Sequence, residues 1–205
     1  MDRDMRRQIG FTLIELMIAL VVLAVLAVVG APAMSSFFEK RRVTDAAMAV
    51  YSQLQLARST AIANSTDITV VVSGSGSSWV IGLTDDDDNS CDLSITAENV
   101  QTNFDNGDAD PFGDACAIDT DLDDADPKKQ ELHRLSADQF SGVTFSAPDD
   151  GWTLIFDSMR GTAPARNVTF TSDGDAAYNL SVYVLPLGQV KVCSSNMPGY
   201  GSCPS

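Results

Sequence analysis

The chain has 205 residues, 44% of them hydrophobic and 20% charged, which is enough for one folded domain with an appendage but not for two large domains. Its formal net charge of -15 argues against a nucleic-acid surface that works by neutralising phosphates. The segment from Thr84 to Glu131 carries 14 Asp and 2 Glu against 2 Lys, which leaves the rest of the chain almost neutral. The acidity therefore belongs to one inserted segment.

The N-terminal thirty residues have the pattern of a membrane-inserted segment. Residues 1–10 are mainly polar and contain Arg3, Arg6 and Arg7, whereas residues 11–30 are mainly apolar and carry a single charge, Glu15. Twenty such residues form a helix of about 30 Å, which is the thickness of a bilayer core. The basic flank is expected to stay in the cytoplasm, so that everything after the span lies outside the cytoplasm.

Two plainer interpretations of this segment stay open. One is a secretory signal peptide cut at Ala31-Pro32-Ala33, and the other is a simple single-pass anchor. The apolar run exceeds the roughly 7 to 15 residues that are typical of signal peptides. Glu15 argues against both interpretations, because a carboxylate inside an apolar membrane segment costs about 3 kcal/mol and calls for a partner.

A cut between Gly10 and Phe11 would create a partner for this carboxylate. The new α-amino group of one subunit, placed beside Glu15 of a neighbour in a low-dielectric bundle, would fix the axial register between helices. Gly10 also suits a protease that needs an unhindered residue at the cut. These residues predict a precursor that is trimmed at its start and then packed into a filament.

The residues from Gly10 to Glu15, which read GFTLIE and lead into an apolar helix, resemble the type IV pilin and type II secretion pseudopilin superfamily. The resemblance implies cleavage after Gly10 by an inner-membrane prepilin peptidase and N-methylation of Phe11. It also implies that Glu15 recruits the subunit, through the inner-membrane assembly platform, to other pilins or pseudopilins that pack by their N-terminal helices. Pro32 falls where many members carry a helix-loosening proline.

The helix is predicted to continue to about Asn64. Between residues 37 and 64 apolar residues recur every three or four positions with polar residues between them, which is the pattern of a helix that packs one face on a sheet. The residues Asn64 to Asp67 favour a turn and end this pattern.

The remainder is predicted to be mainly β. Residues 67–73 and 78–83 predict one hairpin, residues 143–146 and 152–156 a second, and residues 180–185 and 190–193 a third, with a further strand at 168–171. The predicted fold class is α+β, with a long N-terminal helix packed on an antiparallel β-sheet head. The predicted organisation is a leader peptide (1–10), a helix whose first half is transmembrane (11–64), and a periplasmic head (65–205) with an acidic insert (about 84–131).

Two later stretches look like the GspH/FimT branch of the superfamily. These are residues 152–161 and 182–193; members carry a Phe-x-x-x-Gly-type segment and then a final hairpin that ends Gly-Arg-Val-x-Val. Here Gln189 stands where arginine is frequent. The resemblance omits the acidic insert and spans about 150 residues. It implies a minor pilin-like subunit.

Four cysteines in an exported head indicate two disulfides. The two local pairings, Cys91 with Cys116 and Cys193 with Cys203, are preferred among the three possible connectivities. A metal site is the alternative, but no Cys-x-x-Cys pair is present and the single histidine, His133, stands alone.

Part of the acidic insert has the alternating acids of a calcium loop. Asp119, Asp121 and Asp123 are the candidate calcium ligands, but Asp124 stands where such a loop has glycine and Gln130 where it has its bidentate acid. The favoured interpretation is a solvated, self-repelling surface loop without any cofactor. The same two interpretations, calcium ligands or a solvated loop, apply to the acidic residues at 85–88 and 105–110.

No catalytic or nucleotide-binding motif is present in the sequence, so the chain is not expected to be an enzyme. The preferred function is a minor pilin that primes or caps a type IV pilus for adhesion, twitching or DNA uptake. The first alternative is the corresponding minor pseudopilin of type II secretion. The second is a DNA receptor at a pilus tip, against which the sparse basic residues of the head argue.

Overall fold

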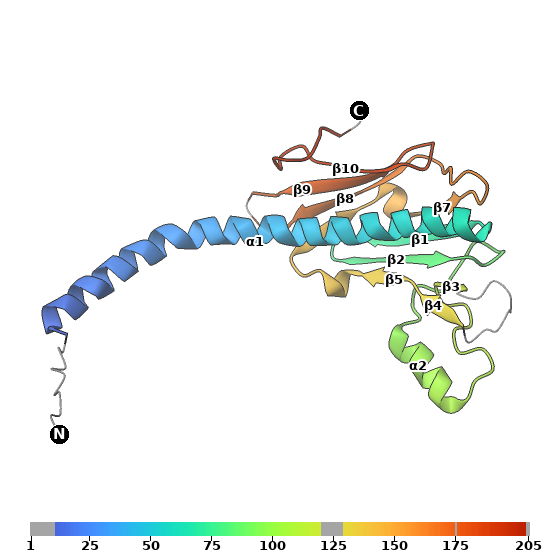
Figure 1. The fold of residues 1–205 in the computed structure, drawn as a ribbon, viewed down its shortest axis with the longest axis horizontal. Coiled ribbons are helices and arrows are strands. Elements are labelled where there is room, and N and C mark those ends of the chain that lie inside the picture. The colour runs from blue at the N-terminus through green and yellow to red at the C-terminus, as the bar shows by residue number, and fades with distance from the viewer. Residues whose placement is uncertain (1–10, 120–128, 175, 204–205) are drawn as a thin grey trace, which may run out of the picture. The chain divides into compact units, whose positions relative to one another are not determined.

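The computed structural model describes residues 11–119, 129–174 and 176–203, with only the backbone described for residues 29–33. The chain divides into two compact units, Met1–Phe38 and Glu39–Ser205. One helix, α1 (Leu13–Asn64), contributes to both units (Figure 1).

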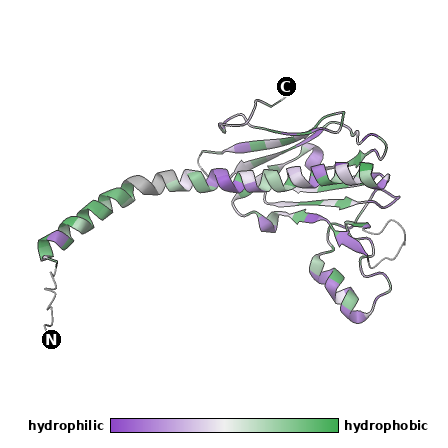
Figure 2. Ribbon diagram, viewed as in Figure 1, coloured by the Kyte–Doolittle hydropathy of each residue, from purple (hydrophilic) through white to green (hydrophobic). Residues whose placement is uncertain are grey.

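The first unit is the N-terminal part of α1. Its side chains from Leu13 to Val28 are apolar and exposed apart from the polar Glu15 (Figure 2). The predicted membrane segment runs to Gly30, so its last residues fall in the stretch 29–33 whose side chains are not described. Within the described residues, no helix has the length and apolarity that a membrane crossing requires, and the predicted span is not found there.

Two four-stranded antiparallel sheets form the second unit together with the rest of α1. Sheet A has the strand order β5-β2-β1-β7 and sheet B the order β10-β9-β8-β6. The strands of sheet A are β1 (Ile68–Ser75), β2 (Ser78–Thr84), β5 (Arg134–Ser136) and β7 (Gly151–Phe156). Those of sheet B are β6 (Val143–Ser146), β8 (Arg166–Ser172), β9 (Asn179–Val184) and β10 (Val190–Cys193). Short 3-10 turns at Ala137–Gln139 and Pro148–Asp150 flank β6.

The core lies between α1 and the sheets. A stripe of small and aliphatic side chains on α1, spaced by three or four residues as predicted, is buried in the same cluster as the inward-facing strand residues. The stripe consists of Val43, Ala46, Ala47, Val50, Leu54, Ala57 and Ala61. Trp79 of β2 stacks on Phe145 of β6 and contacts Phe170 of β8 edge-on, which joins the two sheets. The α+β fold class predicted from the sequence is therefore correct.

Two of the three predicted hairpins are confirmed and one is wrong. Strands β1 and β2 pair with Ser75 opposite Ser78, and β9 pairs with β10. Strands β6 and β7, predicted to pair with each other, belong to different sheets: β6 pairs with β8 and β7 with β1. The connection between them holds Asp149 and Asp150 at positive φ, and this backbone carries the chain from sheet B to sheet A.

The acidic insert contains regular structure within the described residues, whereas the loop predicted at residues 119–126 lies outside them apart from Asp119. The insert contains the helix α2 (Ala97–Asn106) and a two-stranded ladder of β3 (Ala117–Asp119) and β4 (Gln130–Leu132), next to β2 and β5 (Figure 1). Val100, Phe112, Ala115 and Ala117 form its own small core. We call residues 85–119 and 129–132 the acidic subdomain.

Candidate functional site

The start of α1 is the first candidate site. Thr12 precedes the helix, and its Oγ1 accepts a hydrogen bond from the backbone N–H of Glu15 at 3.3 Å, as an N-cap does. Glu15 lies exposed in the first turn, where the helix dipole favours a negative charge. Phe11 is 85% exposed and precedes the helix, whereas Gly10 lies outside the described residues.

The helix surface beside Glu15 is apolar. Five side chains, Ile14, Met17, Ile18, Val21 and Val22, line a shallow apolar groove of about 270 Å³. A helix that exposes large apolar side chains over several turns requires cover from lipid or from other helices. The described stretch Leu13–Val28 therefore carries one carboxylate on an otherwise apolar surface.

The two stretches that resemble the GspH/FimT branch, residues 152–161 and 182–193, both contact one arginine of α1. Arg58 donates from Nε to the carbonyl oxygen of Gly161 at 3.1 Å and from Nη2 to that of Leu187 at 3.3 Å. Gly161 and Gly188 have φ of 58° and 71°, and a Cβ on Gly188 would collide with the Gly161 carbonyl oxygen. The two motifs thus have a shared structural role, which is to lock the β7–β8 and β9–β10 loops together on the helix.

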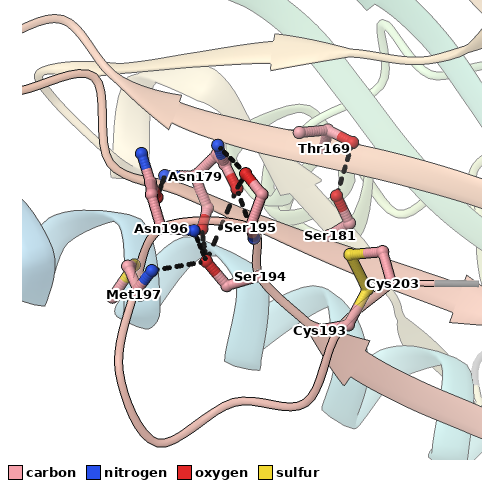
Figure 3. Close-up of a disulfide and its surroundings, with 9 residues drawn as sticks. All are labelled: Thr169, Asn179, Ser181, Cys193, Ser194, Ser195, Asn196, Met197 and Cys203. Carbon is pink, nitrogen blue, oxygen red and sulfur yellow. Dashed lines mark hydrogen bonds between the residues drawn. A yellow bond between two sulfur atoms is a disulfide. The ribbon is translucent and has the colours of Figure 1, made fainter.

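The C-terminal disulfide loop has a defined internal structure (Figure 3). The Cys193–Cys203 disulfide confirms the predicted pairing. Ser194 Oγ donates to the carbonyl oxygen of Asn179 at 2.6 Å and accepts from the backbone N–H groups of Asn196 and Met197 at 3.1 and 2.9 Å. Because Met197 is also buried in the core, the loop is fixed to the end of sheet B at several points.

The second disulfide, Cys91–Cys116, also confirms the predicted pairing and cross-links the acidic subdomain internally, beside sheet A. Gly82, in the middle of β2, lies against this disulfide, and a Cβ at Gly82 would collide with Cys116 Sγ. Glycine is therefore required here for a close approach of the subdomain to the strand.

Replacing both Cys91 and Cys116 by serine is expected to loosen the acidic subdomain alone. The bridge closes a 25-residue separation, and loop-closure entropy puts its contribution at about 3.5 kcal/mol. Hydrogen exchange of the full chain in detergent should show lost protection in α2 with unchanged protection in β1 and β9. The matched control, Cys193→Ser with Cys203→Ser, should instead affect β9 and β10. Full protection of α2 in the first variant would contradict this role of the disulfide.

Six acids of the subdomain line one surface pocket of about 670 Å³. They are Asp86, Asp87, Asp88, Asp92, Asp110 and Asp114. Several of them accept local hydrogen bonds, such as Asp88 from the N–H of Ser90 at 3.0 Å and Asp92 from that of Ser94 at 2.8 Å. Burial raises the pKa of Asp86, a hydrogen bond from Thr84 opposes this, and neighbouring carboxylates raise it further. Several of the acids in this segment therefore have a local structural role, which is to stabilise turns by accepting backbone hydrogen bonds.

The predicted calcium ligands are only partly within the described residues. Asp119 ends β3, and its backbone N–H donates to Asp85 Oδ2 at 3.0 Å. Asp121 and Asp123 lie outside the described residues. In the part of the chain that the structure describes, no three histidine, cysteine or acidic side chains are placed to hold a metal ion. Calcium binding by Asp119, Asp121 and Asp123 stays a prediction.

His133 lies where the acidic subdomain joins sheet A. Its backbone N–H donates to the carbonyl oxygen of Cys116 at 2.8 Å, and its carbonyl oxygen accepts from Leu83 N–H at 3.0 Å. Burial lowers the pKa of His133 from its usual 6.5, and the carboxylates of Glu131 and Asp85 partly oppose this.

The lowered pKa predicts a specific pH dependence. Below about pH 6.5 the unfolded chain binds a proton at this histidine more readily than the folded chain does, so stability is lost as the pH falls through that value. Urea midpoints of the full chain in detergent should therefore fall between pH 7.5 and pH 5.5. In His133→Gln this fall should be smaller, and an identical fall in the variant would contradict the assignment.

Comparisons with known proteins give two family matches. The family described as type II transport protein GspH matches residues 46–188, and the prokaryotic N-terminal methylation motif matches residues 5–31. No curated protein matches the sequence. The crystal structure of the type IV minor pilin FimU from Pseudomonas aeruginosa is similar over 80% of this chain and 98% of that chain, with a TM-score of 0.43 and 16% sequence identity.

Proposed function

Since the chain belongs to the GspH family and carries the N-terminal methylation motif of pilin-like subunits, we propose that it is a minor pilin that primes or caps a type IV pilus. In this proposal the prepilin peptidase cuts after Gly10 and Phe11 becomes N-methylated. The apolar part of α1 is held in the inner membrane with the head in the periplasm until the assembly platform passes the subunit into the fibre. The role is structural and not catalytic.

The exposed apolar surface of α1 with its single carboxylate is the observation that carries this proposal. Fifteen of the sixteen residues Leu13–Val28 expose apolar side chains around Glu15, while the core stripe of the same helix is covered by sheets. A surface of this kind suits a helix that is covered by lipid before assembly and by similar helices afterwards. The carboxylate would meet the new α-amino group of a neighbouring subunit.

The test is the N-terminal mass of the full chain purified from membranes, with and without the peptidase. We expect a chain that begins at methylated Phe11 only when the peptidase is present. Gly10→Val should keep residues 1–10, because a β-branched side chain obstructs the extended substrate at the cut. A chain beginning at Met34, or an unmethylated intact precursor in the presence of the peptidase, would contradict the proposal.

A minor pseudopilin of type II secretion is the second candidate, which the description of the matched family favours. The rigid Cys193–Cys203 loop favours the pilus, because such loops are commoner in pilins. Deletion of the gene separates the two: loss of surface pili supports the first, and loss of exoprotein release with normal pili supports the second. The proposal of a DNA receptor would require a salt-dependent shift of DNA by the purified chain.

A further inference from the structure

We draw no further inference here: the strongest candidate, the surface pocket of the acidic subdomain that Asp86, Asp92 and Asp114 help to line, is a cluster of carboxylates for which no second feature of residues 11–119, 129–174 and 176–203 points to a ligand.

Discussion

Glu15→Gln is expected to abolish incorporation into fibres while leaving processing and folding intact. Glu15 is the one charged residue on the apolar part of α1 that the structure describes, and it lies exposed in the first turn. In the assembled fibre its carboxylate would face the α-amino group of a neighbour, and removing one partner of a desolvated pair costs about 3 to 5 kcal/mol. That cost corresponds to a loss of at least about a hundredfold in association.

The measurement is the ratio of mature chain in sheared fibres to mature chain in membranes. Asp45→Asn is the matched control, because Asp45 is an exposed acid of the same helix and forms an ion pair of 3.6 Å with Arg41. An exposed pair of this kind contributes little, so the control should assemble normally. Normal assembly of Glu15→Gln would contradict the proposed role of the carboxylate, whereas loss of cleavage would indicate a role in peptidase recognition instead.

Trp79→Ala is expected to destabilise the head by about 3 to 5 kcal/mol. Trp79 is 2% exposed, and its ring centroid lies 5.1 Å from that of Phe145 and 5.5 Å from that of Phe170. Its removal would leave a cavity between sheets A and B and break their aromatic contacts. The urea unfolding midpoint of the full chain in detergent, followed by circular dichroism, measures the effect.

Trp79→Phe provides a sharper comparison. The indole Nε1 is buried and has no hydrogen-bond partner among the described residues, so its loss removes an unfavourable group while keeping an aromatic ring. We expect this variant to be clearly more stable than Trp79→Ala. Trp152→Phe is the control, because its half-buried indole donates to the Asn167 carbonyl oxygen at 3.4 Å. Equal destabilisation by Trp79→Phe and Trp79→Ala would contradict this account.

The elements that the sequence predicted well depend on local interactions. The long helix, the β1–β2 and β9–β10 hairpins and both disulfides join residues that are close along the chain, so periodicity, turn residues and cysteine spacing are sufficient signals. The helix α2 also had a local signal that was missed. Thr96 and Asn99 form a capping box and Gly107 a left-handed C-cap, but the density of acids around them suggested a loop.

The arrangement of β6 and β7 was decided only by the tertiary structure. Strand β6 alternates apolar and polar residues, and the last four residues of β7 alternate in burial; such alternation specifies a buried face without specifying a partner strand. Their nearness in the sequence favoured a hairpin, but burial between two sheets and α1 favoured pairing with β8 and β1. The fold of the acidic insert likewise depends on tertiary contacts, because its internal Cys91–Cys116 disulfide packs against Gly82 of β2.

The sequence by itself determined the class of protein, because the N-terminal signature, the apolar helix and the cysteine spacing are properties of short segments. It could not indicate how Arg58 holds the β7–β8 and β9–β10 loops. Arg58 meets Gly161 and Leu187 across separations of 103 and 129 residues, and only the folded chain brings these positions together. Contacts over such distances depend on the packing of whole elements, since the entropy of closing so long a loop is repaid by the complete core and not by any local pattern.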